Sequence, residues 1–473
     1  MSNFVFYDFE TSSSNKYWGQ IIQVGAILTN DNLEELDRYE ARCRLSPSII
    51  PEAMALIVNK SSPKMLKGAN LSHYEMIRQL VETLKRWGKA TYIGYNSIDF
   101  DEEFLRNTLF QTLEYPYLTS TNGNNRGDLL NLARAANLYY PNTLKNSISD
   151  KGNAVYKLDK MAPLNGIEHS DAHSAIGDVI ATLGIGKIIA KKAPSVWKAS
   201  YLTTNKDETL NVIKKELYFC TNEYFYGKSR PYVQTYVCQH PKYQWPKCFD
   251  LRHDPQIYLN MPSAALKIEM GKNPKFLRTI RHNKHPIIMN PSYGNEFDEY
   301  KMLGAEKLAM RAKMVKDNTK FAEKISHILQ DEAEEKEQTK SQEDIYEEES
   351  IYTKFTSNED NKVMPEFHKA EWNKKLSVLD KIKDERLHYF GRRLIYEEKP
   401  ETLPKEDYNR IRRTIAKRLL STNSEKWNTI PRTYSEIDTL REKFEREGKP
   451  ENLTILDDIN AYVEEMEKFY SAA

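Results

Sequence analysis

The chain lacks the features that mark secreted, membrane-spanning and metal-thiolate proteins. Its 473 residues include only four cysteines, Cys43, Cys220, Cys238 and Cys248, and no two of them have the Cys-x-x-Cys spacing of zinc or redox sites. No apolar run approaches the ~18 residues that a membrane-spanning helix needs. The N-terminus shows no basic region followed by a long apolar segment. Because scattered cysteines are typical of a reducing compartment, we expect a cytoplasmic protein without a membrane partner.

Net charge is nearly absent as well. The chain has 69 basic and 68 acidic residues, which leaves a formal net charge of +1. Any surface that binds nucleic acid must therefore be local. With 40% hydrophobic and 29% charged residues, the composition is that of a globular protein, and the length allows two or three domains.

An apolar run near the N-terminus leads directly into two carboxylates. Residues 4–11 read FVFYDFET, and such a short, wholly apolar run predicts a buried strand. Side chains alternate along a strand, so Asp8 and Glu10 project from one face. Two neighbouring anions at the end of a buried strand favour a divalent cation, which prefers oxygen ligands. A solvated loop explains this stretch equally well, and the stretch alone does not decide between the two.

The first 195 residues alternate between strand and helix patterns. Further strands are predicted at residues 21–28, 38–45 and 91–95, and the first three strands of the chain suggest a meander. Apolar residues at helical spacing predict helices at residues 74–87, 100–110, 128–137 and 174–190. The last of these has a predicted buried stripe of Ala175, Ile176, Val179, Ile180, Leu183 and Ile188. Pro194 breaks the pattern, and we place the first domain boundary near it.

The remainder divides into a β-rich middle part and a helical end. From about residue 201 to 330, short β-rich runs alternate with prolines and turn residues, and a helix is expected from about Lys301. Residues 331–350 include ten Asp or Glu, a composition typical of a linker or a solvated helix face. From about Pro365 the pattern is helical. The expected domains are residues 1–195, 196–350 and 351–473.

Two later segments contain further candidate catalytic side chains. Residues 94–107 (GYNSIDFDEEFLRN) place Asp101 in the first turn of a predicted helix. In HSDAHSAIGD, five residues separate His173 from Asp178, a rotation of about 140° on a regular helix. We therefore expect His173 in the loop or first turn and Asp178 on the helix itself. His169 is a rival candidate for the role of His173, and each of these patterns alone is weak.

Together and in this order, the motifs resemble the DEDDh group of 3′→5′ exonucleases. The matching residues are Asp8, Glu10, Asp101, His173 and Asp178. The segments NGIEHSDAHSAIGDV, RGDLLNLARA and RLHYFGRRLIYEEKPETL are similar to the exodeoxyribonuclease I family within that group. This resemblance implies an α/β fold, with an RNase H-like mixed-sheet exonuclease domain, followed by an SH3-like β-rich domain and an all-α C-terminal domain. The three would enclose a groove for single-stranded DNA.

The resemblance also implies a chemistry and a set of contacts. It implies stepwise hydrolysis of single-stranded DNA from a 3′ end to 5′-mononucleotides, with two Mg²⁺ ions on Asp8, Glu10, Asp101 and Asp178, and with His173 as general base. Substrate contacts are implied for Glu10, Arg106, Tyr117, Arg134 and Lys157. Lys157 stands where well-known relatives have arginine, and Thr121 where they have tryptophan. The implied partners are single-stranded DNA and the acidic C-terminal tail of the single-strand DNA-binding protein, and a monomer is expected.

A cluster of cations in the middle part is a further candidate for binding phosphates. A run of this kind is more often a solvated face, but the near-neutral chain makes a local cluster more informative. The six cations are Lys267, Lys272, Lys275, Arg278, Arg281 and Lys284.

Two other functions remain open. An exonuclease of the same group that acts on RNA, or a proofreading subunit, needs little beyond the first 190 residues, whereas this chain has about 280 more. A non-catalytic module that binds single-stranded nucleic acid would be expected to have lost at least one signature residue, and all five are present.

Overall fold

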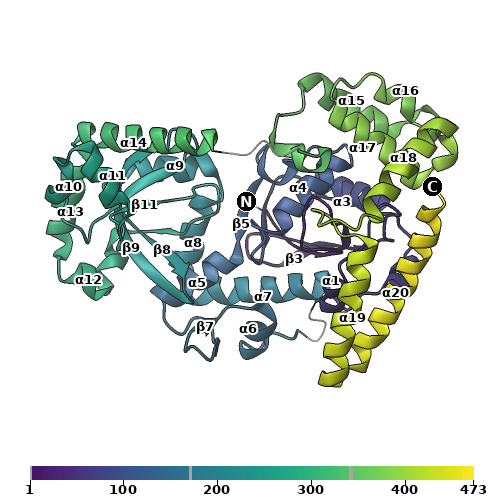
Figure 1. Cartoon of the computed structure of the whole chain (residues 1–473). Helices are drawn as coiled ribbons and strands as arrows, with labels where there is room; N and C mark the ends of the chain where they lie inside the picture. Colours follow the sequence, from purple (N-terminus) through teal and green to yellow (C-terminus); the bar gives the residue numbers. More distant parts are fainter. Residues whose placement is uncertain (1–2, 170–172, 340–344) are drawn as a thin grey trace.

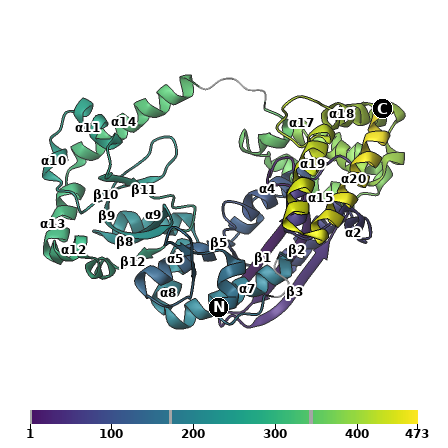
Figure 2. The same ribbon diagram turned by 60° about the horizontal axis from the view of Figure 1, so that its bottom comes forward.

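The computed structural model of the protein describes residues 3–169, 173–339 and 345–473. A mixed sheet formed by the first part of the chain lies between two other parts (Figure 1). On one side is an antiparallel sheet with its helices, and on the other are the helices of the C-terminal part. Figure 2 shows the same arrangement from a second direction, with α19 and α20 side by side next to the first strands.

The central strand of the mixed sheet is β1 (Asn3–Thr11), the predicted buried strand. The sheet has five strands in the order β3-β2-β1-β4-β5. Strand β1 is antiparallel to β2 (Ile21–Thr29), which is antiparallel to β3 (Glu35–Arg42), so the predicted meander is confirmed. On its other side β1 is parallel to β4 (Ala90–Gly94), which is parallel to β5 (Asn125–Asp128). The carboxyl ends of β1, β4 and β5 therefore lie at one edge of the sheet.

Helices cover both faces of this sheet. On one face α7 (Ala175–Lys192) packs against β1 and β2, and on the other α3 (His73–Trp87) packs against β2 and β3. Because side chains alternate along β1, Phe4 and Phe6 belong to the apolar cluster that contains α7, and Val5 belongs to the one that contains α3. Both cores hold β1 rigidly, which fixes the direction of the acids at its end.

The predicted helices of this part are present with small shifts, and α3 ends before Gly88 as expected. The predicted buried stripe of α7 is partly wrong, because Ile180 is exposed and Ile185 and Ile189 are buried instead. Strand β5 was not predicted, since its four residues have no apolar alternation. The other elements of this part are α1 (Ala53–Val58), α2 (Pro63–Lys67), α4 (Asp101–Gln111), η1 (Leu118–Ser120), α5 (Leu129–Tyr139), β6 (Ser147–Ile148), β7 (Ala154–Val155) and α6 (Leu158–Leu164).

The middle part contains a five-stranded antiparallel sheet in the order β11-β10-β9-β8-β12. Its strands are β8 (Phe219–Phe225), β9 (Lys228–Gln239), β10 (Pro246–Asp250), β11 (Leu277–Thr279) and β12 (Ile288–Met289). An SH3-like arrangement of this sheet stays a prediction. Helices α10 to α14 surround it, with η2 between them. Their bounds are α10 (Gln256–Leu259), α11 (Ser263–Gly271), η2 (Pro291–Glu296), α12 (Asp298–Lys301), α13 (Gly304–Lys316) and α14 (Thr319–Gln338).

The prediction of β-rich structure from about residue 201 is wrong for the first residues of the middle part. This stretch is helical, with α8 (Pro194–Thr203) and α9 (Lys206–Lys215). The side chain of Asn205 caps α9 by accepting hydrogen bonds from the backbone N–H groups of Asp207 and Glu208. That cap, followed by two acids in the first turn, is a helix-start signal that the sequence contained.

The C-terminal part is helical, as predicted, and its helices begin earlier than the expected Pro365. Helices α1, α2 and α4 of the first part contact it through α17, α19 and α20. Its elements are η3 (Glu347–Tyr352), α15 (Asn358–Lys369), η4 (Trp372–Lys374), α16 (Lys375–Leu379), α17 (Glu385–Glu398), η5 (Pro400–Thr402), α18 (Lys405–Leu419), α19 (Ile430–Glu447) and α20 (Pro450–Ser471).

A buried carboxylate joins η3 to α17 and α18. The side chain of Glu348 is 1% exposed. It accepts hydrogen bonds from the hydroxyl of Tyr389 at 2.7 Å, from Arg393 at 3.2 Å and from Arg418 at 2.6 Å. Two guanidinium groups thus neutralise one buried anion, and removing the anion would leave both cations without it.

We expect Glu348→Ala to lower the free energy of unfolding of the C-terminal helices by about 2 kcal/mol, because it removes the buried anion that accepts hydrogen bonds from Arg393 and Arg418. Urea unfolding followed by far-UV circular dichroism measures this loss. The matched control is Glu349→Ala, whose carboxylate pairs with the half-exposed Lys426 at 3.1 Å and should cost less than about 1 kcal/mol. Equal losses for the two variants would contradict the buried role of Glu348.

Candidate active site

Three carboxylates meet at the end of β1. Asp8 and Glu10 project from β1, and Asp178 lies in the first turn of α7. Ligand oxygens of the three side chains all lie within 4.8 Å of one another. The start of α7 is set by Ser174, whose hydroxyl accepts a hydrogen bond from the backbone N–H of Gly177 at 3.2 Å. A group of three oxygens at this spacing can hold one hard divalent cation.

The close approach of α7 to the sheet requires a glycine in β2. Gly25 is the residue of β2 that pairs with Asp8. A Cβ atom at Gly25 would lie 2.6 Å from the backbone of Ala175 and Ile176, at the start of α7. A larger residue at this position would push the first turn of α7 outward and take Asp178 away from β1.

Asp101 approaches the same strand from α4. It is the first residue of that helix, which confirms its predicted place in the first turn, and it is 4% exposed. Its carboxylate accepts a hydrogen bond at 3.2 Å from the backbone N–H of Phe9, the residue between Asp8 and Glu10. Asp101 is not one of the three carboxylates whose oxygens lie within 4.8 Å of one another. It thus stands beside that group, bound to the same strand.

Burial and repulsion between carboxylates raise the pKa values of Asp8, Glu10 and Asp101. Burial, followed by the charges of Asp101, Asp178 and Glu10, raises the pKa of Asp8. Burial and then the neighbouring carboxylates raise the pKa of Glu10 to about 8. The pKa of Asp101 is raised to about 8 by burial, against the hydrogen bond from Phe9. The protein alone therefore does not neutralise these groups, and a divalent cation would.

The two candidate histidines have different surroundings. Nε2 of His169 lies 2.5 Å from the carboxylate of Asp178, and the His169 side chain is 1% exposed. His173 precedes α7, as predicted, with a left-handed φ of +68°. Its backbone N–H contacts the carboxylate of Asp178 at 3.4 Å, and the residue lines a cavity. Residues 170–172, between the two histidines, lie outside the described residues.

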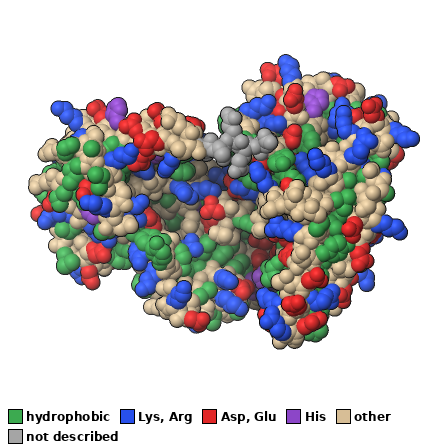
Figure 3. All heavy atoms as spheres, viewed as in Figure 1, with side chains coloured by type: hydrophobic (Ala, Val, Ile, Leu, Met, Phe, Trp, Pro, Cys, Tyr) green, Lys and Arg blue, Asp and Glu red, His purple; other side chains and the backbone are tan. Residues whose placement is uncertain are grey.

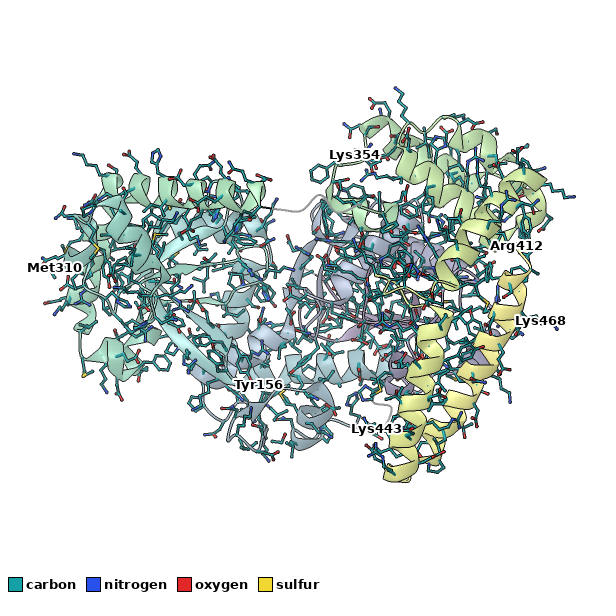
Figure 4. All side chains as sticks on the ribbon, in the orientation of Figure 1. Tyr156, Met310, Lys354, Arg412, Lys443 and Lys468 are labelled. Carbon is teal, nitrogen blue, oxygen red and sulfur yellow. The ribbon has the colours of Figure 1, made fainter. Side chains whose placement is uncertain are left out.

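The cavity next to His173 has a volume of about 600 Å³ and also contains Asp178 in its wall. Two of the predicted substrate contacts, Arg134 and Lys157, line it. The guanidinium of Arg134 lies over the ring of Tyr224, 3.9 Å from its centroid. The first part of the chain and the antiparallel sheet therefore both contribute to the wall. Figure 4 labels Tyr156, another lining residue, between these two parts.

The other two predicted contacts line a second cavity, of about 540 Å³. The guanidinium of Arg106 lies 5.4 Å from the ring centroid of Tyr117, whose ring is 5.9 Å from that of Phe355. Thr121 lines the same cavity, as does Lys354, which Figure 4 labels on the C-terminal part. The predicted substrate contacts thus divide between two cavities, with Glu10 in the carboxylate group.

The cation cluster of the middle part is largely engaged with acids. Lys267 pairs with Glu335, Lys272 with Glu269, and Arg278 with Glu223. Lys267, Lys275, Arg278 and Arg281 line a cleft of about 490 Å³. Figure 3 shows a hollow between the part with the antiparallel sheet and the C-terminal part, with Lys and Arg side chains among those that line it. Phosphate binding by this cluster stays a prediction.

Sequence reasoning missed a buried acid that shapes the site. Asp128 is 5% exposed and accepts hydrogen bonds from the backbone N–H groups of Asn96 at 3.0 Å, Ile98 at 3.2 Å and Leu130 at 3.0 Å. It caps α5 and at the same time holds the loop that leads into α4 and Asp101. The sequence showed only an acid before a helix, which is common, so no signal distinguished it.

Among the helices of the described residues, none is both apolar enough and long enough to cross a lipid bilayer. The four cysteines are free thiols.

Two family models match the chain. The model described as "Exonuclease" matches residues 5–185, and the "Exonuclease I C-terminal domain" matches residues 343–466. The chain is 30% identical over 213 residues to Exodeoxyribonuclease I of Buchnera aphidicola from Acyrthosiphon pisum, covering 45% of this chain and 51% of that protein. It is 25% identical to the enzyme of the strain from Baizongia pistaciae, covering 77% of each. The chain thus matches about half the length of the first relative.

Solved structures have the same fold over nearly the whole chain. Exonuclease I from Methylocaldum szegediense has a TM-score of 0.82 at 20% identity and covers 99% of this chain and 100% of its own. Escherichia coli Exonuclease I in complex with a dA16 oligonucleotide has a TM-score of 0.81 at 18% identity, covering 98% and 100%. A structure of SSB and Exonuclease I with an inhibitor has a TM-score of 0.80 at 18% identity, covering 98% and 100%.

The raised pKa values predict that the metal-free protein loses stability as the pH rises. Glu10 has a pKa of about 8 in the folded protein against an ordinary value of 4.5, so the folded state binds more protons between these values. Its favourable contribution is complete below pH 4.5 and is lost as the pH rises through about 8. We expect Tm in EDTA to fall from pH 6 to pH 8, and Mg²⁺ to raise Tm more at pH 8.

The matched control for this experiment is Glu10→Gln, which removes the titrating group and should flatten the dependence of Tm on pH in EDTA. Thermal unfolding of both proteins at three pH values, with and without Mg²⁺, gives the comparison. An equal slope for the two proteins would show that the Glu10 pKa is not raised.

Proposed function

We propose that this chain is a member of the exonuclease I family and that it hydrolyses single-stranded DNA stepwise from its 3′ end and releases 5′-mononucleotides. The observation that carries the proposal is the convergence of Asp8, Glu10 and Asp178 within 4.8 Å, beside a cavity with His173 in its wall. A histidine next to a partly buried group of carboxylates is what metal-assisted hydrolysis of a phosphodiester needs. The Exonuclease I complex with an oligonucleotide, similar in fold, supports the choice of substrate.

The cofactor in this proposal is a pair of Mg²⁺ ions. The carboxylates of Asp8, Glu10 and Asp178 would hold one ion, and Asp8 with Asp101 would hold the other. The donors are all oxygens, which suits Mg²⁺. The raised pKa values of Asp8, Glu10 and Asp101 show that the protein alone disfavours their charged forms, which a bound cation would stabilise. When bound, such ions lower the pKa of the attacking water and neutralise charge on the phosphate and the leaving oxygen.

His173 is the proposed general base, which takes a proton from the attacking water. Its place in the cavity wall, next to Asp178, supports this role, and histidine is the side chain that most often transfers protons in catalysis. His169 contacts the same carboxylate from a side-chain position that is 1% exposed. We therefore assign His169 to holding Asp178 rather than to proton transfer with water.

Substrate contacts are proposed in two places. Arg134 and Lys157 line the cavity next to His173, where with Glu10 they would hold the terminal nucleotides. Arg106 and Tyr117 line the second cavity and would contact the strand further from its end, with the Tyr117 ring as a face for a base. Lys157 supplies a charge but not the bidentate fork of arginine.

The proposal also includes the domain boundaries, a protein partner and the cellular setting. We place the domain boundaries near residues 195 and 350, which the matched ranges 5–185 and 343–466 support. The acidic C-terminal tail of a single-strand DNA-binding protein is the proposed protein partner, in line with the solved assembly of SSB and Exonuclease I. We propose that the protein acts as a monomer in the cytoplasm, in DNA repair, where its four thiols would stay reduced.

The decisive test is digestion of end-labelled oligonucleotides. With Mg²⁺, single-stranded DNA labelled at its 5′ end should yield a ladder that shortens from the 3′ end. Duplex DNA and EDTA should each suppress the reaction. Opposite polarity, or hydrolysis without a divalent cation, would refute the proposal. Equal degradation of an RNA oligonucleotide would instead favour an RNA-directed exonuclease of the same group.

Asp178→Ala should lower the rate of this digestion by at least about a thousandfold, because it removes one of three converging ligands. Its control is Asp31→Ala in the exposed turn between β2 and β3, which should keep the wild-type rate. A rate for Asp178→Ala close to that of the control would exclude Asp178 from the active site.

Arg134→Ala should raise KM for single-stranded DNA about tenfold and lower the slope of log affinity against log salt by about one, because one phosphate contact is lost. The kcat value should change little. Lys468→Ala on α20 is the control, since Figure 4 shows Lys468 on the outer side of the C-terminal part, and it should leave KM unchanged. A lower kcat at constant KM would assign Arg134 to the chemical step instead.

A further inference from the structure

The segment between β11 and β12 makes an unusual set of contacts with the first part of the chain. His285 in this segment is 2% exposed and has a left-handed φ of +50°. The neighbouring Asn283 accepts a hydrogen bond from Arg126 at 3.4 Å through its carbonyl oxygen. The side-chain amide of Asn131 donates to the carbonyl oxygens of Lys284 and His285 at 3.2 and 3.3 Å. The middle part is thereby bound to β5 and the start of α5.

The ring of His285 has a partner at each nitrogen. Nδ1 accepts a hydrogen bond from the backbone N–H of Asp128 at 2.9 Å, and Nε2 lies 3.1 Å from the carbonyl oxygen of Ser200. A carbonyl only accepts, so Nε2 carries the hydrogen and Nδ1 is free to accept. Burial lowers the pKa of His285 to about 4, which keeps the ring neutral and the acceptor available at neutral pH.

Lys284 contacts the loop between β4 and α4. Its ammonium group donates to the carbonyl oxygen of Ile98 at 3.1 Å and pairs with Asp99 at 2.8 Å. The charge that sequence analysis assigned to a phosphate-binding cluster is therefore directed at this loop.

This loop determines where α4 begins. The carbonyl oxygen of Ser97 accepts hydrogen bonds from the backbone N–H groups of Phe100 and Glu102, on either side of Asp101. Asn96 has a left-handed φ of +61°, and its backbone N–H is held by Asp128. The path of the loop is thus fixed by Asp128 on one side and by Lys284 on the other, and His285 holds Asp128.

We propose that Lys284 and His285 are positioning residues for the metal-binding acid Asp101. They act from the middle part of the chain, His285 through the backbone of Asp128 and Lys284 through Ile98 and Asp99. The geometry of the carboxylate group then depends on the docking of the antiparallel-sheet part against β5. The inference rests on the proposed function, because it concerns the same metal-binding acids.

The test compares three variants of His285 in the full-length chain. His285→Ala removes the acceptor, whereas His285→Asn keeps an acceptor oxygen near the place of Nδ1. Binding of Mn²⁺, a spin probe for the Mg²⁺ sites, is measured by electron paramagnetic resonance in the absence of DNA. We expect the Mn²⁺ dissociation constant to rise about tenfold in His285→Ala, as for other residues that hold metal ligands in place. In His285→Asn it should stay within about threefold of wild type, and His285→Gln should resemble His285→Ala.

Two measurements separate positioning from loss of structure or of DNA binding. DNA affinity in EDTA should stay within about twofold of wild type in all variants, while kcat falls with the Mn²⁺ affinity. Lys284→Met should behave like His285→Ala. The control His240→Ala, a buried histidine of the middle part that lines neither of the two cavities, should change neither value.

Each outcome is decisive. The inference is overturned if Mn²⁺ affinity is unchanged in both His285→Ala and Lys284→Met. It is also overturned if Lys284→Met lowers DNA affinity but leaves Mn²⁺ affinity unchanged, because Lys284 would then be a phosphate contact. If His285→Ala does not fold, the comparison of Asn with Gln at this position, judged by Mn²⁺ affinity, still tests it. If wild type binds Mn²⁺ but does not degrade DNA, the proposed function fails while the positioning role stands.

Discussion

The repulsion among four partly or fully buried carboxylates is the constraint on which the rest of the structure depends. Asp8, Glu10, Asp101 and Asp178 are brought to one sheet edge, and the raised pKa values of Asp8, Glu10 and Asp101 show that this costs free energy. Such an arrangement persists only where the surrounding structure holds it and a cation or protons neutralise it. Gly25 allows α7 to pack closely against β2, because it has no side chain there. Asp128 holds the loop before α4 through hydrogen bonds to its backbone.

The two flanking parts of the chain act as supports of this edge. The loop after β1 is bound to the C-terminal part, since the amide of Asn15 donates to the carbonyl oxygen of Lys426 at 3.0 Å and the rings of Trp18 and Trp427 lie 4.8 Å apart. On the opposite side the segment with His285 is bound to β5. The region around the acids is thus bound on two sides by different parts of the chain, at the loop after β1 and at β5. The middle and C-terminal parts of the chain thus support the candidate active site, in addition to any groove that they form for a DNA strand.

The sequence predicted those features that depend on local pattern. β1 with its two acids, the capped start of α7 and the place of Asp101 on α4 follow from periodicity and helix-start rules. Sequence analysis did not reveal the contacts that depend on distant residues. Asp128 and His285 are 157 positions apart, and a histidine in a turn-rich segment gives no sign of its partner. β5 was missed for a similar reason, because an edge strand of four residues owes its existence to pairing with β4 rather than to its own composition.

The near-zero net charge of the chain is compatible with the proposed polyanionic substrate because acids such as Glu102 and Glu348 are neutralised inside the protein. Glu102 is fully buried and accepts hydrogen bonds from Tyr7, Thr119 and Arg126, and Glu348 neutralises two arginines. An acid used in this way contributes little to the field outside, whereas an exposed cation at a cavity, such as Lys157, contributes more. Bulk charge is therefore a poor guide to the surface potential of this protein. The local balance in the two cavities, where Arg134 and Arg106 lie against aromatic rings, is what a single strand would meet.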